Sequence, residues 1–351
     1  MLGKILKIIG SKKNKGIGID IGTDSVKIIE IEKTTRGIEL VNFGLSRLPE
    51  GTIVDGVITN SMAVEEAIKN IIQKNNFHIK KGTVVTSISG KFAIVKKIKM
   101  PLLQEKEIRQ SIMWEAEQYI PFDIKDVIVD FQILATSENE KGTDVLLVAI
   151  KKERIHTHLE ILNKLKLSPS IIDVDSFAVV NSYLTNTTNK EGVVAFINLG
   201  ANTTNIIILN NEELQFTRDI AMGSKEITQA ISQEMKISYE EAENYKKTQT
   251  VNLLSVNNIL ENLIMEIQRS IDYYKSSFYN MNVGKIILSG GGAKYKNIDR
   301  ILNRKLNLFV EIINPFKKIQ FNPIKFPPEY LQEISSLSST CLGLALRKVI
   351  E

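Results

Sequence analysis

Apolar positions along the chain follow a strand–turn–strand pattern twice. Residues 17–31, IGIDIGTDSVKIIEI, predict an apolar strand, a short polar turn that contains glycine, and a second strand rich in β-branched residues. Residues 195–209, AFINLGANTTNIIIL, repeat this pattern. The repeat aligns without gaps, pairing Asp20 with Asn198, Gly22 with Gly200, and Ser25 with Thr203. Two halves of the chain therefore begin alike.

A third glycine element lies near the end of the chain. Residues 285–302, KIILSGGGAKYKNIDRIL, predict a buried strand, a triple-glycine turn and a helix. Glycine lets the backbone approach a bound group closely, and turn N–H groups together with a Ser or Thr hydroxyl can hold a phosphate. The first two turns lead into strands, so they are neither Walker P-loops nor dinucleotide fingerprints. The candidate binding residues of the three turns are Asp20, Gly22, Thr23, Asp24, Ser25, Gly200, Ala201, Asn202, Thr203, Gly290, Gly291 and Gly292.

Composition favours a large globular protein of more than one domain. The 351 residues are 43% hydrophobic and 24% charged. No apolar run approaches the roughly 20 residues that cross a bilayer, and no secretory signal is present, which predicts a cytoplasmic location. The single cysteine, Cys341, excludes an internal disulfide and any zinc site that needs several cysteines.

The net charge of +5 comes from one end of the chain. Residues 1–15 contain five lysines and no acidic residue, so the remainder is neutral and nucleic-acid binding is not expected. Leu2, Ile5, Leu6 and Ile9 in this segment recur at helical spacing. The segment is either a peripheral contact with an anionic membrane surface or a solubilising leader.

The order of the three glycine elements resembles a known set of motifs. DIGTDS, NLGANTT and LSGGGAKYKNI look like the phosphate 1, phosphate 2 and adenosine motifs of the actin, FtsA and DnaK-type chaperone superfamily. The connecting segments also resemble parts of this superfamily. DVDSFAVVNSY (173–183) resembles the connecting helix, and SSLSSTCLGLALRKV (335–349) resembles the closing helix. AMGSKEITQAIS (221–232) and EAENYK (241–246) resemble the segment that covers the adenosine.

Within this superfamily the chain is most similar to the PilM family of type IV pilus assembly. The similarity lies in SISGKFAIVKKIKMP (87–101), IRQSIMWEAEQYIPFDIKDVIVDFQIL (108–134) and the final GLALR. It implies binding of ATP with Mg²⁺ and docking of the N-terminal cytoplasmic peptide of the inner-membrane protein PilN. It also implies a place at the cytoplasmic face of the inner membrane, beside other pilus assembly proteins.

The resemblance implies an α/β, actin-like ATPase fold of two lobes with the nucleotide cleft between them. The expected parts are a lobe-one core (1–80, 151–189 and 335–351), an inserted α+β subdomain (81–150), a lobe-two core (190–222 and 283–334) and a helical adenosine-covering subdomain (223–282). The pattern within the insertion predicts a strand at 83–99, an amphipathic helix at 104–119, and strands at 127–135 and 144–150.

The resemblance also assigns roles at the site. Asp20 and Asn198 would hold Mg²⁺ through water, but Asn198 lacks the charge of the usual carboxylate, which predicts nucleotide binding with slow hydrolysis at most. Asp175 is the residue expected to position an attacking water, or it caps a helix. Gly223, Glu243 and Lys246 are expected near the adenosine, although Glu243 and Lys246 would also suit an exposed ion pair within one helix.

The helix predicted at 104–119 has two interpretations. Ile108, Ile112, Glu115 and Tyr119 share one face, with Trp114 beside them, and this face either packs under the insertion or forms a partner groove. A docked peptide would extend a strand edge of the insertion or lie between the insertion and lobe one. The alternatives left open are a filament-forming FtsA-type division protein, a type II secretion or competence component, a small-molecule kinase, and self-association.

Overall fold

The first of two large sheets contains the first glycine turn. The computed structural model describes residues 15–102, 104–134, 142–188, 191–278 and 281–350; the segment with the proposed membrane contact, apart from Lys15, lies outside them. The strand order in this first sheet is β10-β6-β1-β2-β3-β16. Its strands are β1 (Lys15–Ile21), β2 (Ser25–Thr34), β3 (Gly37–Arg47), β6 (Val84–Ile88), β10 (Ile171–Val174) and β16 (Gln320–Phe321). β1 pairs antiparallel with β2 and parallel with β6.

The second large sheet repeats this arrangement. Its order is β13-β12-β11-β14-β15, in which β11 pairs antiparallel with β12 and parallel with β14. The strands are β11 (Val193–Leu199), β12 (Thr204–Asn210), β13 (Glu213–Ile220), β14 (Lys285–Ser289) and β15 (Phe309–Ile312). The duplication in the sequence is therefore a duplication of hairpins, each at the centre of its own sheet.

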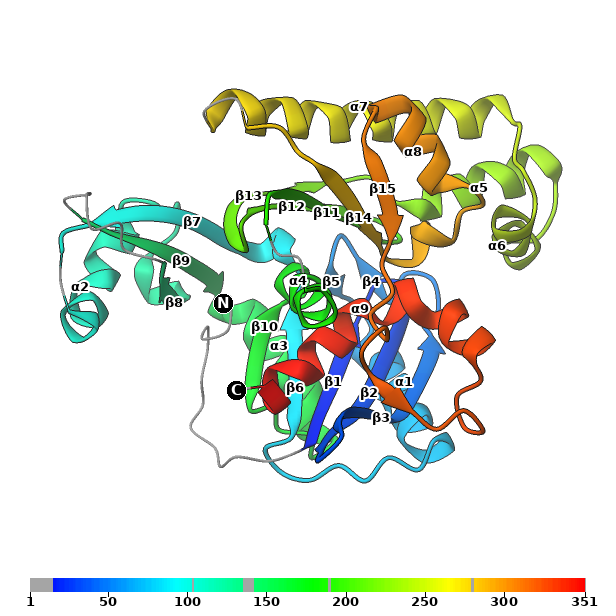
Figure 1. The fold of residues 1–351 in the computed structure, drawn as a ribbon. Helices are drawn as coiled ribbons and strands as arrows, with labels where there is room; N and C mark the ends of the chain where they lie inside the picture. Colours follow the sequence, from blue (N-terminus) through cyan, green and yellow to red (C-terminus); the bar gives the residue numbers. More distant parts are fainter. Residues whose placement is uncertain (1–14, 103, 135–141, 189–190, 279–280, 351) are drawn as a thin grey trace.

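Two helices, α4 (Asp175–Asn186) and α9 (Pro328–Ile350), lie between the sheets (Figure 1). Glycines bring their backbones unusually close to their neighbours. A Cβ atom on Gly18 of β1 would lie 1.9 Å from the Cys341 carbonyl oxygen of α9, and one on Gly343 would lie 1.7 Å from the Ala178 carbonyl oxygen of α4. A buried ion pair also joins the layers, because Arg347 Nε lies 3.2 Å from Asp173 Oδ2.

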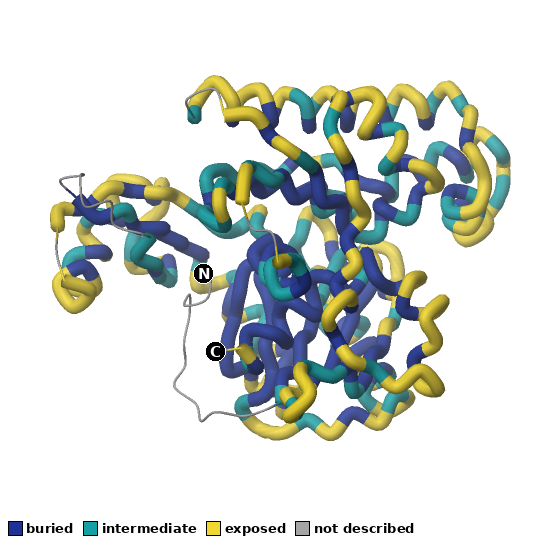
Figure 2. Tube along the Cα trace, in the orientation of Figure 1, coloured by how far each residue is buried: buried dark blue, intermediate teal, exposed yellow. Residues whose placement is uncertain are grey.

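Other helices cover the outer faces of the two large sheets. α1 (Ser61–Lys74) and α3 (Lys152–Lys164) pack on the first sheet, beside the short hairpin of β4 (Ile53–Val54) and β5 (Val57–Ile58). The second sheet is covered by α5 (Ser224–Met235), α6 (Tyr239–Thr248), α7 (Leu254–Ser277) and α8 (Ile298–Leu306). The buried residues concentrate in the sheets and in the central helices (Figure 2).

A small unit projects to one side of this body (Figure 1). Its sheet has the order β7-β9-β8, formed by β7 (Ala93–Met100), β8 (Val127–Ile133) and β9 (Thr143–Lys151), with α2 (Glu105–Glu117) packed on it. Ile108 and Ile112 of α2 are buried in the core of this unit. Trp114, 75% exposed, and Tyr119, 40% exposed, are not. The apolar face of α2 therefore packs only in part.

Three predicted boundaries need correction. The strand predicted at 83–99 is two strands, β6 in the first sheet and β7 in the insertion, separated by a 3₁₀ turn at Gly90–Phe92. Residues 320–321, expected in lobe two, pair instead with β3 of the first sheet. The closing helix begins at Pro328 and not at 335, because proline suits the first position of a helix. No helix in the described ranges is long and apolar enough to span a membrane.

Candidate functional site

The first two glycine turns have the same internal geometry. In the β1–β2 turn, the Gly22 amide donates a hydrogen bond to the Ser25 carbonyl oxygen at 3.1 Å. In the β11–β12 turn, the Gly200 amide donates to the Thr203 carbonyl oxygen at 3.0 Å. A Cβ atom on Gly200 would lie only 2.8 Å from that carbonyl oxygen, so this tight turn needs glycine.

The third glycine turn is anchored beside the second. Gly290 follows β14 with φ +87°, and a Cβ atom on it would lie 2.4 Å from the Leu199 carbonyl oxygen at the end of β11. The Gly290 amide also donates to the Ser336 carbonyl oxygen of α9 at 2.9 Å. Both the conformation and the close approach exclude a side chain here. Distant parts of the sequence therefore meet at one point.

One cleft of about 670 Å³ is lined by all three turns. Its volume lies within the range of small-molecule sites. Most of the predicted site residues line it, namely Asp20, Gly22, Thr23, Asp24, Ser25, Asp175, Asn198, Gly200, Ala201, Asn202, Thr203, Glu243, Gly290 and Gly291. Gly223, Lys246 and Gly292 do not. Gly223 and Gly292 pack behind the lining, where a Cβ atom would lie 2.2 Å from the Ala201 oxygen and from Leu199 Cγ, respectively.

An ion pair at the first turn was not predicted. Lys27 Nζ lies 3.1 Å from Asp20 Oδ2, and the two residues face each other across β1 and β2. Burial disfavours the charged amine, but the adjacent Asp20 carboxylate outweighs this and raises the pKa of Lys27. Lys27 therefore remains a cation on the floor of the cleft. The signal was a lysine flanked by the apolar residues Val26 and Ile28.

Asp175 is held at the junction of α4 and the insertion. Its Oδ1 atom accepts hydrogen bonds from the Gly90 amide at 2.9 Å and from the Ser176 amide at 2.6 Å. Burial raises the pKa of Asp175 to about 7, and the nearby Asp219 and Asp20 carboxylates add to the effect. Asp175 thus stabilises the start of α4 and also lines the cleft.

Asp175→Asn is expected to raise the free energy of unfolding above that of the wild type by more at pH 8 than at pH 5, and the difference between the two effects should be about 2 kcal/mol. The raised pKa means that the folded state binds the proton more tightly than the unfolded state, so stability falls as pH rises from about 4 to about 7. Asparagine removes this ionisation and can still accept both amide hydrogen bonds.

Urea unfolding of both proteins at the two pH values measures the effect. The comparison separates Asp175 from Asp173, whose pKa burial also raises, because Asp173 is present in both. Asp126→Asn, at an exposed position, is the control. Equal pH dependence in the wild type and in Asp175→Asn would show that Asp175 does not titrate in this range.

The Glu243–Lys246 pair is not the exposed pair considered from the sequence. Lys246 is 1% exposed, and its Nζ atom contacts Glu243 Oε2 at 2.6 Å and Thr228 Oγ1 at 2.7 Å. Burial alone would raise the pKa of Glu243, but Lys246 and Lys247 lower it to about 2. Lys246 therefore holds an ionised Glu243 at the cleft wall from behind and does not line the cleft itself.

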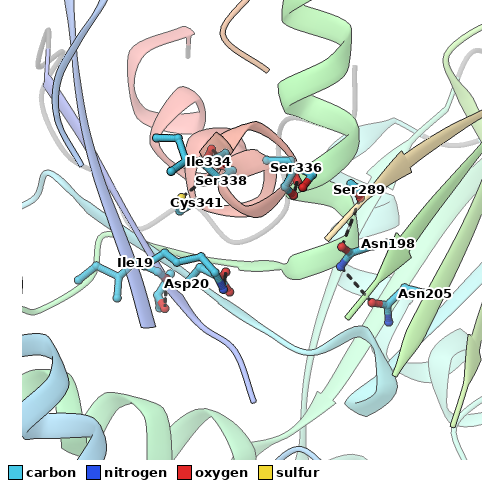
Figure 3. Close-up of polar contacts among 12 residues, drawn as sticks. Ile19, Asp20, Asn198, Asn205, Ser289, Ile334, Ser336, Ser338 and Cys341 are labelled. Atoms are coloured by element: carbon cyan, nitrogen blue, oxygen red, sulfur yellow. Dashed lines mark hydrogen bonds and ion pairs between the residues drawn. The ribbon is translucent and has the colours of Figure 1, made fainter. Parts of the chain in front are cut away.

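A row of polar side chains runs across the second sheet from the second turn. Ser289 Oγ donates to Asn198 Oδ1 at 3.3 Å, and Asn198 Nδ2 donates to Asn205 Oδ1 at 3.3 Å (Figure 3). Asn205 Nδ2 then donates to Asp219 Oδ1 at 2.5 Å. Burial raises the pKa of Asp219, opposed by this hydrogen bond and by Lys91. Asp219 and Asn205 were both missed from the sequence.

Other missed residues reach the cleft from both sheets. Lys225 of α5 lines it and bonds Glu50 Oε1 at 2.7 Å, which joins the second half of the chain to the first. His158 of α3 also lines it, and burial lowers its pKa to about 4, so the ring is neutral at pH 7. Neither residue belongs to a local motif, so only the tertiary arrangement reveals them.

Comparison with known proteins shows which family this chain resembles. The family model described as type IV pilus assembly protein PilM matches residues 18–349. The solved PilM-PilN type IV pilus biogenesis complex has a chain 27% identical to this one, with a TM-score of 0.86 over 97% of this chain and 99% of that chain.

More distant relatives share part of the sequence or only the fold. The cell division protein FtsA of Streptococcus pneumoniae is 27% identical over 251 residues, which are 65% of this chain and 54% of FtsA. The match thus spans about half the length of this FtsA. Ethanolamine utilization protein EutJ from Carboxydothermus hydrogenoformans, 13% identical with a TM-score of 0.53 over 97% of this chain and 92% of that chain, shares the fold alone.

Proposed function

The chain belongs to the PilM family of type IV pilus assembly proteins and has the predicted actin-like fold, and from this premise we propose that it is an ATP-binding adaptor of pilus assembly. In this proposal it docks the N-terminal cytoplasmic segment of a PilN protein at the inner membrane. Its nucleotide state changes its affinity for that segment. The observation that carries the proposal is the convergence of three glycine turns on one cleft.

The cleft suits a nucleotide with Mg²⁺. The Gly22 and Gly200 turns would hold the phosphates from opposite sides, Lys27 would offset their charge, and the bare backbone of Gly290 and Gly291 leaves room for the sugar and base. Bound Mg²⁺ would neutralise phosphate charge. Asp20 and Asn198, one at each of the first two turns, would hold this Mg²⁺ through water.

The protein groups at the cleft favour binding over fast hydrolysis. The side chain at the second turn is a neutral amide, which holds a cation less strongly than a carboxylate does. Asp175 is the residue expected to take a proton from water, and it lines the cleft. Its Oδ1 atom is already engaged by two backbone amides. Slow turnover is therefore expected.

A structural link supports coupling between the cleft and the insertion. The chain passes from β6 to β7 through Gly90–Phe92, and the Gly90 amide is bonded to Asp175 in the cleft. Phe92 at the same turn lies under the Arg154 guanidinium, 4.4 Å from the ring centroid, and both residues line the cleft. A change at Asp175 would thus reach the connection between β6 and β7 directly.

Calorimetry with a synthetic peptide of the candidate PilN N-terminus tests this function. We expect the peptide to bind the full chain, and saturating Mg·ATP to change its affinity by about fivefold or more. A scrambled peptide is the control. Folded protein that binds neither ATP nor the peptide would contradict the adaptor, whereas peptide binding that is insensitive to ATP would contradict the coupling alone.

A further inference from the structure

Three polar side chains line up across the second sheet and end at a carboxylate. Asn198 on β11 is the cross-strand partner of Asn205 on β12, and Asn205 is the partner of Asp219 on β13. Hydrogen bonds join all three, and Ser289 of β14 adds a fourth member at the other end. Asn198 lines the cleft at the second glycine turn, whereas Asp219 lies outside the lining.

The carboxylate fixes the orientation of both amides. An ionised Asp219 can only accept hydrogen bonds, so Asn205 must present its NH₂ group to Asp219 and its oxygen to Asn198. Asn198 must then present its own NH₂ group to that oxygen, which turns Asn198 Oδ1 toward Ser289 and Gly290. Without the carboxylate, both amides could reverse, since oxygen and nitrogen have nearly the same shape.

The row also polarises Asn198. A hydrogen bond from an amide NH₂ group to a charged acceptor draws electron density toward the oxygen of the same amide, and successive bonds reinforce one another. The Asp219 charge therefore makes Asn205 Oδ1, and in turn Asn198 Oδ1, a stronger acceptor. The oxygen at the second turn gains part of the negative character that asparagine lacks by itself.

The other side of Asp219 faces the β6–β7 connection at Gly90. A point at the Cβ position of Gly90 would lie 3.6 Å from Asp219 Oδ2 and 3.4 Å from Asp175 Oδ1. Lys91, next along the chain, attracts the Asp219 carboxylate. Asp219 thus lies where the second sheet meets the β6–β7 connection, held by Asn205 on one side and facing Lys91 and Asp175 on the other.

We propose that Asp219 is a positioning residue for the cation that accompanies the nucleotide, acting through Asn205 to orient and polarise Asn198 Oδ1. This inference rests on the proposed ATP binding. In this proposal, the negative charge that a carboxylate at position 198 would supply comes instead from Asp219, which lies two strands away on β13. Asp219 does not touch the nucleotide, so its effect should appear in the dependence of ATP affinity on Mg²⁺ and not in the affinity measured without Mg²⁺.

The test is the ATP affinity of the full chain with Mg²⁺ and with EDTA. Asp219→Asn keeps the shape and removes the charge. We expect its EDTA affinity to stay within about twofold of the wild type, while the gain in affinity from Mg²⁺ falls about fivefold. Glu213→Gln, which removes a carboxylate from the same strand, should leave that gain unchanged. In Asn198→Asp/Asp219→Asn, a carboxylate stands directly at the turn, and the gain should return.

Each outcome decides between the two proposals. ATP binding by the wild type with an unchanged Mg²⁺ gain in Asp219→Asn would overturn the role of Asp219 and leave ATP binding intact. Equal losses with and without Mg²⁺ would mean a merely structural role. If Asp219→Asn does not fold, Asn205→Ala tests the same row, and an unchanged Mg²⁺ gain there would also overturn the inference. A folded wild type that binds no ATP would overturn both proposals.

Discussion

Gly22→Asp is expected to lower ATP affinity by at least about 100-fold, because a carboxylate would stand among the amides that face the phosphates. Two like charges about 4 Å apart cost about 4 kcal/mol near a protein surface, and 100-fold corresponds to about 2.7 kcal/mol. The new carboxylate would also compete for Lys27, since a Cβ atom on Gly22 would lie 3.4 Å from Lys27 Nζ.

The fold should survive this change. The nearest backbone atom to a Cβ on Gly22 is the Ser25 carbonyl oxygen at 3.3 Å, which small shifts of the turn can accommodate. Gly284→Asp is the matched control, because exposed Gly284 precedes β14 at the end away from the glycine turns, is not among the positive-φ glycines, and a Cβ there would lie at an ordinary 3.4 Å from the Val193 carbonyl oxygen. Calorimetry at one protein concentration compares the three proteins. Wild-type affinity in Gly22→Asp would place the nucleotide elsewhere.

Gly343→Val is expected to destabilise the protein by about 3 kcal/mol or more. Helix propensity alone predicts the opposite sign, since glycine inside a helix is worse than other residues by up to about 1 kcal/mol. At this position, however, a Cβ atom would lie 1.7 Å from the Ala178 carbonyl oxygen of α4, a backbone atom that cannot rotate away. The clash would force α9 away from α4, and overpacking of a core is costly.

Urea unfolding measures this effect. Gln332→Ala, at an exposed position of the same helix, is the control and should change stability by less than about 0.5 kcal/mol. The displacement of α9 should also weaken ATP binding in any protein that still folds, because the Gly290 amide is bonded to Ser336 of α9. Wild-type stability in Gly343→Val would mean that α4 and α9 are farther apart than the structure indicates.

The glycine turns could be predicted from sequence because their chemistry is local. Gly22 and Gly200 each close a hairpin whose strands adjoin in the chain, so the alternation of apolar and polar residues identifies turn and strands together. The fold was implied by the family resemblance that the order of these motifs carries, and the solved structures confirm it. Within the insertion, α2 and the strands β8 and β9 lie close to their predicted ranges.

The sequence was less informative where the burial or pairing of a residue depends on a helix or strand elsewhere in the fold. Lys246 resembled a surface residue because its helix is polar, and only the packing of α5 against α6 buries it beside Thr228. The break at Gly90 was not recognised within 83–99, because only the short turn at Gly90–Phe92 separates two strands that join different sheets. Asp219 carried no motif at all, because its role depends on the pairing of β12 with β13.

Hydrogen–deuterium exchange of the full chain with and without Mg·ATP tests the central claim most directly. If one nucleotide is held between the two sheets, peptides that contain residues 20–27, 198–205 and 289–294 should all exchange more slowly when ATP is present. Protection should develop at the same ATP concentration in all three segments. Protection of one segment alone, or of none, in a folded protein would contradict the claim that the three turns form a single ATP site.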